Sequence, residues 1–211
     1  MRRLLTTITL AAVALIAANL PAATPRARAQ DLPPGLYDVA RVQTRLNVRA
    51  APALDAPVIG WLARDAAGIE VVARDAAGAW GRVNLIERSG WVSLDYLYAR
   101  EDDLWSANAL PSTLRCFGTE PFWDLSHEGD RLIGDGVDEA AKREFMIDGV
   151  AGAAGAASRV VVARDQHGTV TLGIAPEECG DGMSERVYGL GARLSEGNAP
   201  TRTGCCSIAP R

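Results

Sequence analysis

The first half of the chain carries short stretches in which hydrophobic and polar residues alternate, each bounded by Gly, Pro, Asp or Asn. A period of two is the pattern of a half-buried β-strand, and the bounding residues favour tight turns. We therefore expect strands at Arg45–Arg49, Val58–Leu62, Ile69–Ala73, Trp80–Leu85 and Gly90–Ser93. The side chains expected to fill a common core are Leu46, Val48, Ile59, Val71 and Val83.

The second half shows the same pattern after a linker expected at residues 100–112. The segment 149–158 (GVAGAAGAAS) is small and Gly-rich, so we expect a flexible loop there. The pattern predicts an all-β protein of two β-rich parts, and we expect the second, at residues 113–211, to be a small β-barrel or sandwich. The strands expected in this second part are Phe122–Ser126, Arg131–Gly134, Glu144–Ile147, Arg159–Ala163, Thr169–Ile174, Val187–Leu194 and Gly204–Ile208.

The first 29 residues are typical of a secretory signal peptide. A basic start, Met1–Arg3, precedes an apolar run from Leu4 to Ala18 that is short for a membrane span. An A-x-A pattern at 27–29 predicts cleavage near Ala29. We expect a periplasmic or secreted protein with no membrane insertion after cleavage; the alternative is a retained anchor.

Composition and charge narrow the classes of function. The chain is 48% hydrophobic and 23% charged, which is ordinary for a globular protein. Removing residues 1–29 takes away four arginines and no acid, so the formal net charge falls from −4 to −8. That charge, without any Lys/Arg block in the mature chain, argues against a nucleic-acid partner. No phosphate-binding Gly loop or catalytic pair can be placed, so we expect a non-enzymatic protein without a cofactor.

Four landmarks occur in order over about 55 residues: LNVRAAP from Leu46, VIGWL from Val58, WGRVNL from Trp80 and GWVSLDYL from Gly90. Together they resemble a bacterial SH3 (SH3b) domain, which implies an SH3-like small barrel at residues 44–99 after a lead segment, 30–43. LYDV at 36–39 resembles the first-strand motif of eukaryotic SH3 domains. Because bacterial domains rarely place that motif before LNVR, we interpret the match as a coincidence and leave these residues in the lead segment.

The SH3b resemblance also implies a binding function. Such domains commonly bind cell-wall peptides or glycan through an aromatic groove, so the implied partner is peptidoglycan or an envelope protein. The candidate binding residues are Trp61, Trp91, Tyr96 and Tyr98. The alternative is a core or shielding role, which we expect for Trp80 and Trp91.

The second part carries RCFGTEPFW from Arg115, CGDGMSERVY from Cys179 and GCC from Gly204. These motifs resemble an uncharacterised family of bacterial envelope proteins, for which we know of no established activity. The resemblance covers about 95 residues and includes all the cysteines of the chain. These are Cys116, Cys179, Cys205 and Cys206.

An even set of cysteines in an exported protein favours two disulfides. A bond between the neighbours Cys205 and Cys206 would be strained, so Cys116 and Cys179 would each bond to one of them, in either pairing. Neighbours in a strand face opposite ways, so the bonds would emerge on opposite sheet faces. The other hypotheses are a metal site, which lacks a C-x2-C pair, and redox chemistry, which lacks a C-x-x-C motif.

The GTEPFW motif suggests a further candidate site. Phe122 and Trp123 face opposite sides of an extended strand, so one is expected in the core and the other partly exposed. Trp123 could stack on a ligand while Glu120 accepts a hydrogen bond; alternatively, Glu120 only caps or solvates a turn. The acids around Cys179 do not match a calcium loop, so we expect a solvated loop and no metal site.

Three functional hypotheses follow. The leading one is an exported non-enzymatic binding protein of the bacterial cell envelope, whose SH3b domain contacts peptidoglycan or an envelope protein. The second is a periplasmic small-ligand or metal-binding protein that uses the C-terminal domain. The third is a thiol redox enzyme that acts through Cys205 and Cys206.

Overall fold

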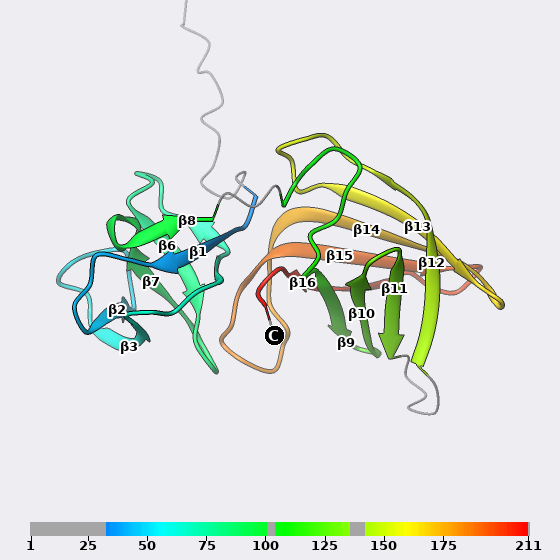
Figure 1. Ribbon diagram of the computed structural model, residues 1–211. Helices are drawn as coiled ribbons and strands as arrows, with labels where there is room; N and C mark the ends of the chain where they lie inside the picture. The colour runs from blue at the N-terminus through cyan, green and yellow to red at the C-terminus, as the bar shows by residue number, and fades with distance from the viewer. Residues whose placement is uncertain (1–32, 101–103, 136–141, 211) are drawn as a thin grey trace, which may run out of the picture.

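The computed structural model describes residues 33–100, 104–135 and 142–210. The expected signal peptide lies outside these residues. In the described part of the chain, no helix is long and apolar enough to cross a membrane. The chain folds into two β units, which we call the N-terminal unit (33–100) and the C-terminal unit (104–210) (Figure 1). The predicted all-β class is therefore confirmed.

Two small antiparallel sheets make up the N-terminal unit. One has the order β4-β1-β8 and the other the order β3-β2-β7-β6-β5. A short 3₁₀ turn, Leu94–Tyr96, precedes β8. The strands are β1 (Gly35–Val39), β2 (Arg45–Arg49), β3 (Val58–Ala63), β4 (Ile69–Val71), β5 (Ala73–Arg74), β6 (Trp80–Asn84), β7 (Ser89–Ser93) and β8 (Leu97–Ala99).

The core of the N-terminal unit matches the alternation in the sequence. Val48, Val83 and Val92 are completely buried, and Ile59 packs against them. Their polar neighbours on the same strands point away from this core, as a period of two requires. The five side chains expected to fill the core therefore do so, with Leu46 and Val71 also buried.

Part of the expected lead segment, 30–43, is a β-strand. Residues 35–39 form β1, which pairs with β4 on one side and β8 on the other. Leu36 and Tyr37 are buried, at 4% and 8% exposure. The sequence LYDV is thus an integral strand of the N-terminal unit, and assigning it to the lead was wrong. Leu36 and Tyr37 are neighbours and both are buried, so this strand lacks the period of two that marked β2.

Eight antiparallel strands form a closed barrel in the C-terminal unit (Figure 1). Strands that follow one another in the chain are neighbours, and β16 closes the barrel by pairing with β9. The structure thus selects the barrel over the sandwich. The strands are β9 (Arg115–Thr119), β10 (Phe122–Glu128), β11 (Arg131–Asp135), β12 (Lys142–Ala151), β13 (Arg159–Asp165), β14 (Gly168–Cys179), β15 (Tyr188–Glu196) and β16 (Arg202–Ser207).

Apolar side chains fill the barrel interior. Val161, Leu190 and Cys206 are completely buried, and Trp123 and Phe145 are 4% exposed. An eight-stranded barrel has an interior just wide enough for side chains to fill or for one small ligand. Here the side chains take most of that space.

The segment before β9 covers one end of the barrel instead of serving as an extended linker. Trp105, Leu110 and Leu114 are buried against the core, at 7%, 9% and 2% exposure. Arg159 lies beneath them, 1% exposed, and its guanidinium donates to the carbonyls of Ser106, Ala109, Ala156 and Ser158. Burying an arginine requires such partners, because an unsatisfied buried cation is costly.

The Gly-rich segment is also more ordered than expected. Residues 149–151 belong to β12, and the loop that follows supplies two of the carbonyls that accept from Arg159. A Cβ atom on Gly152 would lie 2.6 Å from the Arg159 guanidinium, so only glycine fits there. Close packing around an arginine therefore explains Gly152, whereas Gly155 has open space around it and a positive φ of 73°.

The two units dock through several direct contacts. Glu70 on β4 accepts hydrogen bonds from Ser207 Oγ at 2.5 Å and from the Ile208 amide at 3.1 Å. Gly189 on β15 lies so close that an added Cβ would sit 2.3 Å from the Val72 carbonyl oxygen. These contacts bury Glu70 to 6% exposure.

Candidate functional site

The three motifs of the C-terminal unit meet on the outer wall of the barrel. The β9–β10 turn, the end of β14 with residues 180–183, and the strands β15 and β16 line a groove of about 780 Å³, which we call the outer groove. Its walls come from segments far apart in the chain, so local sequence patterns do not reveal it. The lining residues include acidic, aromatic and sulfur-containing side chains: Glu120, Phe122, Glu177, Cys179, Met183 and Cys205.

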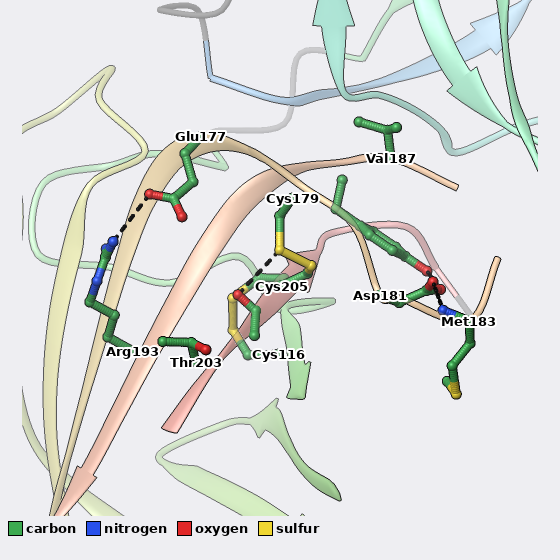
Figure 2. Close-up of a disulfide and its surroundings, with 12 residues drawn as sticks. Cys116, Glu177, Cys179, Asp181, Met183, Val187, Arg193, Thr203 and Cys205 are labelled. Carbon is green, nitrogen blue, oxygen red and sulfur yellow. Dashed lines mark hydrogen bonds and ion pairs between the residues drawn. A yellow bond between two sulfur atoms is a disulfide. The ribbon is translucent and has the colours of Figure 1, made fainter. Parts of the chain in front are cut away.

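Two disulfides are present, as the sequence predicts. Cys179–Cys205 lines the outer groove (Figure 2), whereas Cys116–Cys206 lies in the barrel core. Cys205 and Cys206 are neighbours on β16 and point to opposite faces of the wall, which resolves the pairing that the sequence left open. Both bonds fit an oxidising compartment.

The acids near the groove are mostly engaged rather than simply solvated. Glu177 folds over Gly191, where an added Cβ would lie 2.4 Å from its carboxyl carbon, and it pairs with Arg193 at 3.4 Å (Figure 2). Glu178 pairs with Arg82 of the N-terminal unit at 3.2 Å. The outer groove therefore carries less negative charge than its composition suggests.

Asp181 organises the loop beside the disulfide. Its carboxylate accepts from the amides of Met183 and Ser184, both at 2.9 Å (Figure 2). Burial alone would raise the pKa of Asp181, but these hydrogen bonds, the Ser184 hydroxyl and the charge of Arg186 outweigh it and lower the pKa. The carboxylate is therefore a stable structural anion at neutral pH.

Residues 180–187, which we call the docking loop, contact the N-terminal unit. The Ser89 amide donates to the Glu185 carbonyl at 3.1 Å, and the Glu185 amide donates to the Glu87 carbonyl at 2.9 Å. The Val187 amide donates to Ser89 Oγ at 2.8 Å, and Asn84 Nδ2 donates to the Val187 carbonyl at 2.9 Å. The expectation of a solvated loop holds for the exposed side chains of Glu177, Glu178 and Glu185, but the backbone of residues 185–187 bonds to the N-terminal unit instead of to water.

Glu120 and Trp123 do not form the stacking pocket considered from the sequence. Trp123 is 4% exposed inside the barrel, and its indole Nε1 donates to the Thr203 carbonyl at 3.2 Å. Glu120 is exposed at the groove rim, and Phe122 is 62% exposed there. Phe122 thus points out of the barrel and Trp123 points into it, as strand alternation predicts.

The interior cavity beside Trp123 is small. It measures about 30 Å³, room for water rather than for an organic ligand. Arg143 lines it and donates to Asp165 at 2.9 Å and to Glu196 at 2.6 Å. Burial would raise the pKa of Asp165, but the amides of His167 and Gly168 and the guanidinium of Arg143 lower it. This polar network occupies that end of the barrel.

The aromatic candidates of the N-terminal unit lie at the surface. Trp61 is 55% exposed, Tyr98 59% and Tyr96 42%. Trp91 is half-buried, as is Trp80, and Arg82 stands over the Trp91 ring at 5.9 Å. Neither tryptophan is fully buried, so their expected core role is only partly realised.

Trp61 has polar neighbours suited to recognition, which the sequence analysis missed. It lies on β3 directly across from Asn47 on β2, and both are exposed. The guanidinium of Arg45, two residues before Asn47 on the same strand, lies 6.0 Å from the Trp61 ring centroid. Alternation in RLNVR was the available signal, because Arg45 and Asn47 share the face that points away from the core.

Within the described residues, no group of three or more His, Cys, Asp or Glu side chains is placed to hold a metal ion. No family model, curated protein or solved structure matches this chain. Function therefore has to be inferred from the surfaces described above.

Proposed function

We propose that this protein is an exported, non-enzymatic binding protein of the bacterial cell envelope. Its N-terminal unit is an SH3b-type module that binds the glycan of peptidoglycan through the exposed face of β2 and β3. The observation that carries this proposal is the exposed Trp61 between Asn47 and Arg45.

The chemistry of this face suits a sugar. An exposed indole offers a flat apolar surface to the C–H face of a sugar ring. Asn47 supplies an amide donor and acceptor, and Arg45 supplies several N–H donors, for hydroxyl and acetamido groups at the ring edge. Trp and Arg are also the side chains enriched where binding energy concentrates.

The compartment agrees with this assignment. The predicted signal peptide would export the chain, and two disulfides fit the oxidising space in which peptidoglycan lies. The charge of the mature chain gives no general attraction to anionic polymers. Retention on the wall would then depend on specific contacts, which the Trp61 face provides.

The alternative functions have less support. A small-ligand protein would need an interior cavity of several hundred Å³, and the one beside Trp123 measures about 30 Å³. The thiol redox enzyme considered from the sequence would act through Cys205 and Cys206 together, and each of these is bonded to a different cysteine. These observations favour surface binding through the N-terminal unit over both alternatives.

The test is cosedimentation of the mature chain, residues 30–211, with purified sacculi. We expect wild type to be retained and Trp61→Ala to bind about 30-fold more weakly, since truncating a central anchor costs about 2 kcal/mol. Trp61 is exposed, so the variant should keep the wild-type melting temperature.

Val58→Ala is the matched control, because Val58 lies on the same strand and is 51% exposed. It should bind sacculi like wild type. The proposal fails if wild type is retained no better than an unrelated acidic protein, or if Trp61→Ala and Val58→Ala bind equally well.

A further inference from the structure

We propose that the Cys179–Cys205 disulfide is a site of thiol–disulfide exchange. A dithiol reduces it selectively while Cys116–Cys206 stays intact, and its reduction loosens the docking loop that joins the two units. This inference is independent of glycan binding, because it concerns the other unit and a different surface.

The two disulfides differ in their access to solvent. Cys116 and Cys206 are both completely buried within the barrel core. Cys179 is half-buried and lines the outer groove, with Cys205 beneath it at 1% exposure. Exchange requires a thiolate to reach a sulfur atom, and of the two disulfides only Cys179–Cys205 lines a surface groove.

The outer groove provides room for a reductant. Its volume of about 780 Å³ exceeds that of a small dithiol or an extended peptide segment that carries one. Glu177 and Glu178 precede Cys179 and are exposed, and Glu120 lies at the rim. Arg193 and Arg82 offset the charges of Glu177 and Glu178, so the selectivity between the two disulfides comes from burial and not from charge.

The chemistry balances with a dithiol as the reductant. Its thiolate attacks Cys179 Sγ, the S–S bond breaks, and the electron pair leaves with Cys205 Sγ, which takes up a proton. The second thiol of the reductant then attacks the mixed disulfide and releases the Cys179 thiol. The dithiol is oxidised to a disulfide, and the protein gains two electrons and two protons.

The reducible bond stands at the base of the docking loop. β14 ends at Cys179, residues 180–187 follow, and β15 begins at Tyr188. Through Cys205, the disulfide ties this base to β16, across the intervening strand β15. Breaking it leaves the loop held by hydrogen bonds to Asn84, Ser89 and Glu87, which open more readily without the covalent tie.

The first test is differential alkylation of the native mature chain treated with dithiothreitol, read by peptide mass spectrometry. We expect Cys179 and Cys205 to be labelled at least about tenfold faster than Cys116 and Cys206. In urea the four cysteines should be labelled at similar rates, which shows that the selectivity comes from the fold. Equal native rates, or earlier labelling of Cys116 and Cys206, would overturn the proposal.

A second measurement tests the link to docking. Hydrogen exchange at the amides of Glu185 and Val187 should become at least about fivefold faster after native reduction, while Val161 in the barrel stays protected. The paired substitution Cys179→Ser with Cys205→Ser should reproduce this without reductant. If hydrogen exchange at both loop amides stayed unchanged, the proposed link between disulfide reduction and docking would be wrong.

Discussion

The burial and the hydrogen bonds of Glu70 depend on the docking of the C-terminal unit. Within the N-terminal unit it lies on β4 and points away from the core, as a polar strand residue should. In the whole molecule it is 6% exposed and accepts from Ser207 and Ile208. Burial raises its pKa, and the hydrogen bonds from Ser207, Ile208 and Ala209 and the charge of Arg186 offset part of that rise. Its sequence neighbourhood carries no sign of this burial.

The raised pKa of Glu70 gives a pH-dependent contribution to stability. Below the ordinary value of 4.5 the carboxyl is protonated in both states, and its contribution is fully present. As pH rises from there through the raised native pKa, the unfolded chain loses the proton first, so this contribution is lost. Glu70→Gln cannot titrate, and its amide can donate to Ser207 Oγ.

We therefore expect the unfolding free energy of wild type, relative to Glu70→Gln, to fall as pH rises above about 4.5. Urea titrations from acid to neutral pH measure it. Glu128→Gln is the control, because Glu128 is exposed, and its difference from wild type should vary much less with pH. A constant difference between wild type and Glu70→Gln would contradict the assignment.

At the scale of elements, barrel closure depends on the contact between β16 and β9. Gly204 lies where an added Cβ would meet the Phe117 carbonyl oxygen at 2.0 Å and the Trp123 ring at 2.9 Å. The glycine thus lets two strands pair while a buried tryptophan packs beneath them. Closure therefore depends on positions with no side chain, Gly204 on β16 and Gly118 on β9, where an added Cβ would meet the Thr203 carbonyl oxygen at 2.5 Å.

We expect Gly204→Ala to destabilise the protein by at least about 2 kcal/mol, because backbone and indole must both move. Gly173→Ala on β14 is the matched control. Its Cβ would find the nearest atom at 3.8 Å, an ordinary contact, so the change should stay within about 1 kcal/mol. Urea unfolding of the two variants checks this, and equal stabilities would refute the role of Gly204.

Features that depend on neighbouring residues could be predicted from the sequence, whereas features that depend on distant segments could not. Alternation at Leu46 and Val48 predicted β2 well, because a strand with one buried face shows a period of two within its own sequence. It missed β9, where Gly118 interrupts the hydrophobic set, and short β8. The adjacency of Cys205 and Cys206 reduced the possible disulfide pairings to two. The outer groove could not be predicted, because it joins segments about 80 residues apart in the chain.

At the scale of the whole molecule, the two units form one assembly. The docking loop, Glu70 and the close approach of Gly189 to Val72 all hold the same interface. Interfaces between units in one chain are often small and allow relative motion. Here hydrogen bonds from three segments of the C-terminal unit restrict that motion, so the Trp61 face is held in a fixed relation to the barrel.

Gly189→Ala should separate the units without unfolding either, because its Cβ would meet the Val72 carbonyl at 2.3 Å and Pro34 at 2.8 Å. We expect a larger radius of gyration in small-angle scattering and two unfolding transitions in place of one. Gly173→Ala should scatter like wild type. An unchanged radius of gyration for Gly189→Ala would show that the interface accommodates the methyl group.

The strand β16 and the residue after it also impose an order on folding. Both native disulfides, the closure of the barrel and the ties to Glu70 involve residues 202–208. A chain made from its N-terminus exposes Cys116 and Cys179 before either native partner has emerged. In an oxidising space, a bond between these two cysteines is the available error, and native structure then requires disulfide exchange. A chain that has formed the Cys116–Cys179 bond would therefore have to exchange it before β16 can close the barrel.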